Sequence, residues 1–105
     1  MVHYIIVRAD LPHGVQVAQT AHAAGESVPE CSAPLPEGTI VVALAVPDEQ
    51  TLRTVAAALE HHSLRHKIIV ENDGLYAGQA MAIGVRPTRD RAAVRKAVSS
   101  LPLVR

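Results

Sequence analysis

The pattern of apolar positions divides the chain into alternating strands and helices. Short, nearly continuous apolar runs predict four strands, and apolar residues recurring every three or four positions predict three helices. The strands are expected at 4–7, 39–46, 67–70 and 80–85. The helices are expected at 15–24, 47–63 and 87–101. The order is therefore β-α-β-α-β-β-α, within a single domain that spans residues 1–105.

The connections between these elements set the expected topology. Helices join the first three strands, so each β-α-β step should be parallel and right-handed. The last two strands are separated by the short loop 71–78 and can pair antiparallel. We therefore expect an α/β fold, a four-stranded mixed sheet with helices on both faces. The run 39–46 has hardly any polar residue, which predicts a strand covered on both sides. Residues 28–38 contain three prolines and predict an irregular crossover.

Each predicted helix carries one apolar stripe that should face the sheet. The stripe positions are 17, 18, 21 and 24 in the first helix, 52, 55, 56 and 59 in the second, and 94, 97, 98 and 101 in the last. A chain of 105 residues with 49% apolar residues has limited interior in which to hide such stripes. We therefore expect a homodimer that buries what the sheet leaves uncovered of 52–59 and 94–101.

Composition and charge narrow the possible functions. Ten basic and ten acidic residues cancel, and the chain has two Tyr but no Phe or Trp. A global basic field and a base-stacking platform are thus both missing, so any nucleic-acid contact should be local and modest. The single cysteine, Cys31, cannot form an intramolecular disulfide. The first apolar run is too short for a signal peptide and no run is long enough for a membrane span, so we expect a cytoplasmic protein.

The first helix carries a polar stripe that its packing does not require. Gln19, His22 and Glu26 lie along one side, opposite the apolar positions and among alanines. Glu26 stands in the (i, i+4) relation to His22 and could fix the tautomer of the imidazole. The simpler interpretation is a solvated helix face with an incidental histidine. The small neighbouring residues favour a site, because they let a ligand approach the backbone closely.

The position of this helix also favours a ligand site. It begins where a central parallel strand should end, and ligand clefts of open α/β sheets lie at the carboxyl ends of strands. Asp10, His13 and Gly14 belong to the same edge. The free N–H groups of residues 14–17 would favour an anion. The turn is not a phosphate loop, because it has one glycine and no following Lys-Ser/Thr.

The loop 71–78, ENDGLYAG, is the second candidate. Asp73 could orient a base or a water molecule, and Tyr76 could offer a stacking surface or simply plug the loop. Carboxylates around Asn and Gly are also what an ordinary turn contains. His22 and Asp73 would together form a plausible acid–base pair.

Metal binding and RNA binding receive weaker support from the sequence. The histidines at 61, 62 and 66 match no common zinc spacing, and we expect neither a metal nor a cofactor. The basic residues concentrate at Arg86, Arg89, Arg91, Arg95 and Lys96. They form either a solvated helix surface or a small phosphate-contacting patch.

These motifs together resemble one known family. VRADL, then G-x-x-x-A-Q-x-x-H-A-A, then VPDEQTL and a closing Ile-Gly-x-x-Pro at 83–87 are similar to the type II peptidyl-tRNA hydrolases. The resemblance runs from Tyr4 to Leu103, and AQTAHAA at 18–24 is its most specific part. It implies a four-stranded mixed sheet, usually in a homodimer. It also implies metal-independent hydrolysis of the ester between a peptide and tRNA.

The resemblance assigns roles to individual residues and also shows departures. His22 and Gln19 match the histidine and glutamine of the family's first helix, and Asp73 matches its acidic loop residue. Val15 stands where the family has a functional lysine. Leu75-Tyr76-Ala77 replaces the family's threonine, and the usual basic surplus is missing.

Two functions from different classes follow. The first is an ester hydrolase that acts on peptidyl-tRNA, with His22 and Asp73 as catalytic residues. Its substrate-binding residues would be Asp10, His13, Gly14, Gln19, Tyr76 and Arg86. The second is a binding or regulatory module that kept the fold and lost the chemistry, which the missing lysine and the neutral charge favour.

Overall fold

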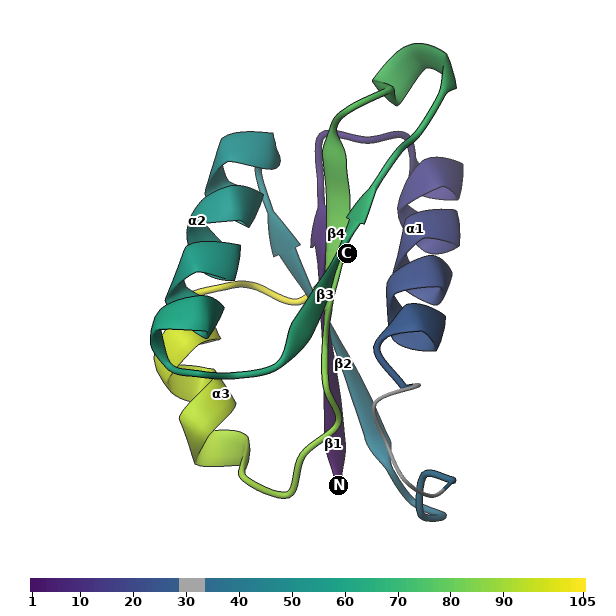
Figure 1. Ribbon diagram of the computed structural model, residues 1–105. Coiled ribbons are helices and arrows are strands. Elements are labelled where there is room, and N and C mark those ends of the chain that lie inside the picture. Colours follow the sequence, from purple (N-terminus) through teal and green to yellow (C-terminus); the bar gives the residue numbers. More distant parts are fainter. Residues whose placement is uncertain (29–33) are drawn as a thin grey trace.

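In a computed structural model, which describes residues 1–28 and 34–105, the chain forms one four-stranded sheet between two layers of helices (Figure 1). The strands are β1 (Val2–Arg8), β2 (Ile40–Val46), β3 (His66–Val70) and β4 (Ala80–Val85). The helices are α1 (His13–Glu26), α2 (Glu49–His61) and α3 (Arg91–Val98), with a short 3₁₀ helix, η1 (Gly74–Tyr76), between β3 and β4. The predicted fold class and element order are confirmed. Cys31 lies outside the described residues.

The strands lie in the order β2-β1-β4-β3. β1 pairs parallel with β2, as expected for the first β-α-β step, and β4 pairs antiparallel with both β1 and β3. In the second step β3 also runs parallel to β2, but the two strands are not neighbours. After α2 the chain crosses to the far edge of the sheet, so β3 pairs with β4 and with neither β1 nor β2. The three strands β1, β2 and β3 nevertheless run in one direction and end at one edge, the upper edge in Figure 1.

The two apolar strands of the first β-α-β unit differ in burial. Every residue of β1 is buried, as befits a central strand. The prediction that 39–46 is covered on both sides is wrong, because β2 is an edge strand in which Ile40 and Val41 are 53% and 58% exposed. The helix α1 packs on β1, β4 and β3, so one face of β2 lies beyond its reach.

The helices α2 and α3 cover one face of the sheet (Figure 1). Their predicted stripes face inward: Leu52, Val55, Ala56, Leu59, Val94 and Val98 are buried, and Ala97 and Leu101 pack against the same core. The expectation that these stripes form a dimer surface is therefore wrong. A single chain already removes them from water.

The helix α1 covers the other face, but not with the predicted side. Its buried residues are Gln16, Gln19 and Ala23, whereas Val17 is 70% exposed. Two buried glutamines are tolerated because each amide nitrogen has a hydrogen-bond acceptor, described below. The polar stripe of the sequence is thus split, with Gln19 inside and His22 outside.

Acidic residues cap the other two helices. Asp48 accepts a hydrogen bond from the backbone N–H of Thr51 at 2.8 Å, in agreement with the predicted start of α2. The last helix starts later than predicted, with Asp90 as its cap, because Thr88 pairs with Val2 as an extended residue. The helices α1, α2 and α3 have 14, 13 and 8 residues, and no described helix is long and apolar enough to cross a membrane.

The helix α1 lies very close to β4 at Gly84. A Cβ atom there would collide with the backbone oxygen of Ala23 and with the side chain of Ser27. Ser27 Oγ donates to this same oxygen at 2.7 Å and lies 2.7 Å from the Nε2 of the buried His3. Burial lowers the pKa of His3, which favours a neutral ring in this contact. The end of α1 is thus fixed to the sheet.

This close approach predicts a large effect of one methyl group. Gly84→Ala should lower the free energy of unfolding by about 2 kcal/mol or more, since the colliding atoms include backbone. Gly25→Ala is the matched control, because Gly25 also lies at this end of α1 but has no atom within 4 Å of a new Cβ. It should stabilise the helix by about 0.5–1 kcal/mol. Urea denaturation measures both, and equal stabilities of the two variants would contradict the packing described here.

Candidate active site

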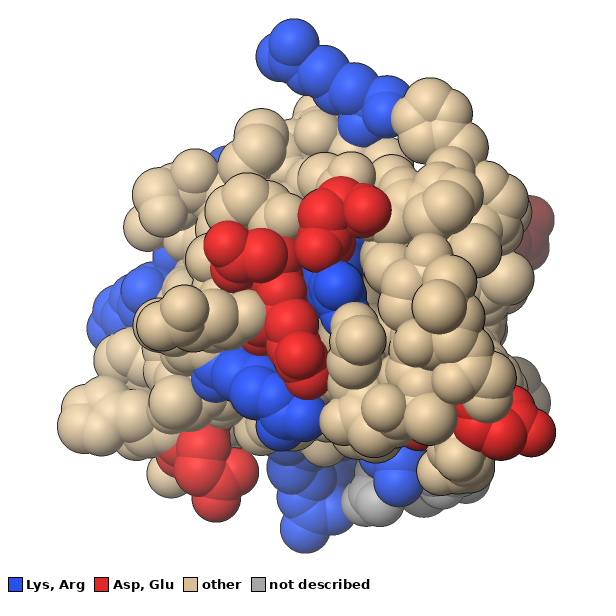
Figure 2. Space-filling view, turned by 90° about the horizontal axis from the view of Figure 1, so that it is seen from above, with Lys and Arg blue, Asp and Glu red and all other residues tan. Residues whose placement is uncertain are grey.

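The candidate site lies at the edge where β1, β2 and β3 end and β4 begins. Seen from above, Asp and Glu side chains gather in the middle of this edge, next to Lys and Arg side chains (Figure 2). The acidic residues that follow these strand ends are Asp10, Asp48, Glu49, Glu71 and Asp73. Acidic residues from separate loops therefore come together at this edge. The groups that make the contacts are described below.

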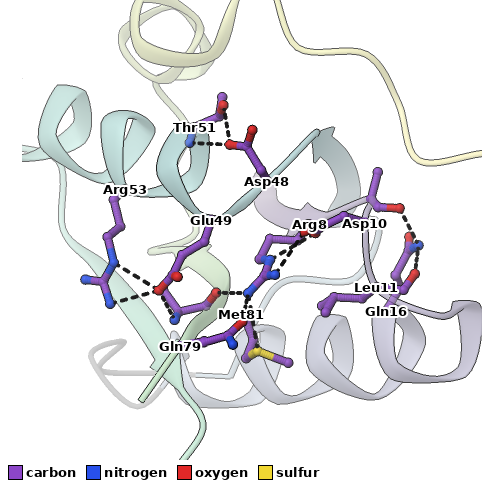
Figure 3. Close-up of polar contacts among 12 residues, drawn as sticks. Arg8, Asp10, Leu11, Gln16, Asp48, Glu49, Thr51, Arg53, Gln79 and Met81 are labelled. Atoms are coloured by element: carbon purple, nitrogen blue, oxygen red, sulfur yellow. Dashed lines mark hydrogen bonds and ion pairs between the residues drawn. The ribbon is translucent and has the colours of Figure 1, made fainter. Parts of the chain in front are cut away.

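A buried arginine is the centre of this edge, and sequence reasoning missed it. Arg8, the last residue of β1, has a side chain only 8% exposed. Its Nε and Nη2 donate to the two carboxylate oxygens of Asp10 at 3.0 and 2.9 Å. Its Nη1 donates to Gln79 Oε1 at 2.8 Å and to the Ala80 backbone oxygen at 3.1 Å (Figure 3). A strand that ends in R-x-D was the available signal.

The surroundings of Arg8 hold it in the charged form. The hydrogen bond with Asp10 raises the pKa of Arg8 most, and the negative charges of Asp10 and Glu49 add to this against the effect of burial. Bidentate pairing with Asp10 fixes the orientation of the guanidinium as well as its charge. Of the predicted binding residues, Asp10 is therefore paired directly with this cation.

Glu49 ties α2 to the same edge. Its Oε2 accepts the backbone N–H of Ala80 at 2.8 Å and Nε of Arg53 at 3.2 Å (Figure 3). The hydrogen bond from Ala80 is the main reason why the pKa of Glu49 is lowered. The first turn of α2 and the first residue of β4 are thereby joined through a charged group.

The two buried glutamines of α1 fix the other side of the edge. Gln16 donates to the backbone oxygen of Leu11 at 2.6 Å and of Ala9 at 3.3 Å, which holds the turn between β1 and α1. Gln19 Nε2 donates to Glu71 Oε2 at 3.0 Å. Within the described part of the chain, the buried Oε1 of Gln19 has no hydrogen-bond partner. The amide of Gln19 thus contacts the loop through its nitrogen and not through its oxygen.

The loop carboxylate that meets α1 is therefore Glu71, two residues before the predicted Asp73. The loop closes on Glu71, whose backbone N–H donates to Gln79 and whose backbone oxygen accepts from Gly78. Asp73 precedes η1 and is exposed, without a side-chain capping bond. The match of this loop to the family's acidic residue does not distinguish two carboxylates that lie two positions apart.

His22 lies on the exposed surface of α1, with a side chain 64% exposed. Its Nε2 is 3.6 Å from Glu26 Oε2, so the expected (i, i+4) pair forms. Among the described residues, no hydrogen bond or ion pair joins His22 to the loop 71–78. The acid–base pairing of His22 with Asp73 stays a prediction.

The remaining predicted residues divide between the two ends of the sheet. His13 and Gly14 form the exposed first turn of α1, where Pro12 provides no side-chain cap for the free N–H groups. Arg86 follows β4 at the opposite end, roughly 20 Å away for six residues of strand. The structure therefore does not bring Arg86 together with the other binding residues.

Arg86 instead lines a second cleft, of about 790 Å³, together with Arg65 and Lys67. Arg65 and Lys67 lie at or just before the start of β3. Within residues 1–28 and 34–105, no three His, Cys, Asp or Glu residues lie close enough to hold a metal ion. Glu26 and Glu60 also line this cleft, so it carries charges of both signs.

Fold and site together define a small α/β protein with a polar centre at the carboxyl edge of a mixed sheet. The model of the family described as peptidyl-tRNA hydrolase PTH2 matches residues 1–104, and the chain belongs to this family. The resemblance found in the sequence is thereby confirmed. The family acts as hydrolases of peptidyl-tRNA, in translation. A comparison with curated proteins finds no match.

The burial of Arg8 predicts a strong effect of removing its charge. Arg8→Met should lower the free energy of unfolding by about 3 kcal/mol, because Asp10 and Gln79 lose a buried partner. Arg53→Met is the matched control: its side chain is 52% exposed and pairs with Glu49, so it should cost only about 0.2–1 kcal/mol. Urea denaturation of both variants is the measurement. An Arg8→Met variant as stable as Arg53→Met would refute the central place given to Arg8.

Proposed function

We propose that the chain hydrolyses the ester that joins a peptide, or an N-blocked aminoacyl group, to the terminal ribose of tRNA, without a metal or cofactor. Family membership supports the reaction class. The observation that carries the proposal is the 3.0 Å hydrogen bond between Gln19 and Glu71. It holds a carboxylate beside α1, whose first-turn N–H groups have no side-chain cap.

In the proposed reaction, Glu71 takes a proton from a water molecule whose oxygen attacks the ester carbonyl carbon. The N–H groups of the first turn of α1, at His13 and Gly14, stabilise the resulting oxyanion. The bond from this carbon to the ribose oxygen then breaks, and the proton held by Glu71 passes to the ribose oxygen. The products are a peptide with a free carboxyl group and a tRNA with a free hydroxyl.

The pair predicted from the sequence competes with Glu71 for the role of base. His22 lies one turn beyond Gln19 on α1, and Glu26 is positioned to orient its ring. Asp73 belongs to the same loop as Glu71 and would have to reach His22 once a substrate is bound. The burial and fixed hydrogen bond of Gln19 favour Glu71, because a catalytic group works best when it is held before the substrate arrives.

A release assay with N-acetyl-aminoacyl-tRNA distinguishes these assignments. Glu71→Gln should lower kcat by ~10²–10⁴-fold, the usual contribution of a general base. Asp73→Asn, the same change at an exposed carboxylate two residues along, and His22→Ala should each lower kcat by less than about tenfold. The opposite ranking would assign the chemistry to His22 and Asp73. No turnover by the pure wild-type protein would overturn ester hydrolysis altogether.

The second candidate function is a binding module with the same fold and no chemistry. Two observations favour it: Val15 stands at the family's lysine position, and carboxylates gather in the middle of the site's edge. In that case the protein should retain peptidyl-tRNA without releasing the peptide. The release assay and a binding assay on the same preparation separate the two functions.

We further propose that tRNA binds weakly and through the basic end of the sheet. The cleft lined by Lys67 and Arg86 lies at this end, and α3 adds Arg91, Arg95 and Lys96. Binding that depends on a few such contacts is strongly salt-dependent.

Filter binding of tRNA at low and at physiological salt tests this surface. Arg86→Gln and Lys67→Gln should each weaken binding at low salt and reduce the slope against the logarithm of salt concentration by about 1. Arg53→Gln is the control, because Arg53 lies at the acidic edge and is paired with Glu49. Tight binding that is insensitive to salt would contradict the proposed surface.

The homodimer and the cytoplasmic location stay predictions for this chain. With the stripes of α2 and α3 buried, a dimer would have to use other apolar side chains. The large apolar side chains that are exposed include Ile40, Leu75 and Leu103.

A further inference from the structure

One flank of α1 forms an apolar groove that the proposed catalytic groups do not use. Its aliphatic lining consists of Val17, Ala21, Ala24, Ala43 and Val104, and its volume is about 610 Å³. This flank faces β2, whereas Gln19 and His22 lie on the flank toward β3. A site of this size, mostly apolar with a few polar groups, is typical of ligand-binding clefts.

The groove exists because α1 covers only part of the sheet. It packs on β1, β4 and β3, so residues such as Ala43 of the edge strand β2 lie beyond it. The end of the chain forms the far wall: Leu103 bridges to Leu44, and the Val104 N–H donates to the Ala43 oxygen at 3.0 Å. This pairing also occupies the β2 edge here, so a second copy of the chain cannot add a strand at this place.

The groove is continuous with the edge that carries the proposed site. A second hollow of about 390 Å³, lined by Ala9 and Ala45, shares His13, Gln16, Val104 and Arg105 with the groove. Ala9 directly precedes Asp10. The polar groups therefore stand at the end nearest the site, and the aliphatic surface continues from there along α1.

We propose that this groove holds the peptide part of the substrate and selects apolar residues upstream of the esterified one, an inference that rests on the proposed function. Three strand spacings, about 14 Å, separate the end of β3, which carries Glu71, from the end of β2. An extended peptide spans this distance with about four residues. With the esterified residue at Glu71, the upstream residues of the peptide would cross the start of α1. Their side chains would then enter the groove beside Val17.

Two substrates with the same esterified glycine test this selection: N-acetyl-Gly-tRNA and N-acetyl-Leu-Leu-Leu-Gly-tRNA. The wild type should hydrolyse the longer one with kcat/KM about tenfold higher, the gain expected from burying part of one leucine side chain. Ala21→Leu, which fills the groove, and Val17→Ser should bring this ratio close to one. Ala18→Leu is the matched control, because Ala18 is exposed on the same helix but is not part of the groove lining.

A binding measurement keeps this inference separate from the proposed function. N-acetyl-Leu-Leu-amide should shift the backbone amide resonances of Val17, Ala21 and Val104 in the wild type and in Ala18→Leu, but not in Ala21→Leu. If the peptide shifts these resonances while no peptidyl-tRNA is hydrolysed, the groove binds apolar peptide and the proposed function is wrong. If peptidyl-tRNA is hydrolysed but Ala21→Leu keeps the wild-type ratio, the groove inference is overturned.

Sedimentation of the same variants tests whether a second copy of the chain occupies the groove instead. A wild-type particle of twice the 11.2 kDa chain that falls to one chain in Ala21→Leu, but not in Ala18→Leu, would mean that a second copy fills the groove. That result would overturn the inference. A mass that Ala21→Leu leaves unchanged supports it.

Discussion

The polar edge of this protein is organised by one buried cation, the guanidinium of Arg8. A charge removed from water must be paired and hydrogen-bonded, so its partners are not free to move. Those partners are Asp10 in the turn before α1, and Gln79 and Ala80 at the start of β4. Segments more than 70 residues apart in the sequence are therefore held in one arrangement by a single side chain.

The orientation of α1 follows from the same requirement applied to neutral groups. Gln16 donates a hydrogen bond to the backbone oxygen of Leu11, in the turn that Arg8 helps to fix. Gln19 donates to the carboxylate of Glu71. Both amide nitrogens reach these acceptors only if this side of the helix faces the sheet. Val17 and its aliphatic neighbours are then left on the outside, which explains how a groove comes to lie next to the polar site.

The zero net charge conceals a separation of charge along the sheet. Carboxylates surround Arg8 at one edge, whereas Lys67 and Arg86 lie at the other, a strand length away. Such a separation would orient a substrate that has phosphates at one end and an uncharged peptide at the other. The cations attract the phosphates, whereas the peptide has no charge to bring it to them. The groove along α1, which lies between the two edges, fits the uncharged part.

The sequence by itself determined the order of the elements, the α/β class, the family and the inward faces of α2 and α3. It could do so because amphipathic periodicity is local: Leu52 and Leu59 lie on one face of α2 whatever surrounds it. The motif AQTAHAA was equally readable, since its residues are neighbours on one helix.

Only the tertiary structure decided which strands are neighbours, how α1 is rotated and which carboxylate meets it. The apolar run of β2 was read as a covered strand because hydrophobicity does not encode position in a sheet. The burial of Gln19 and the choice of Glu71 over Asp73 depend on a partner 52 residues away. Arg8 was missed for the same reason, because a polar residue becomes central only when distant segments supply its hydrogen bonds.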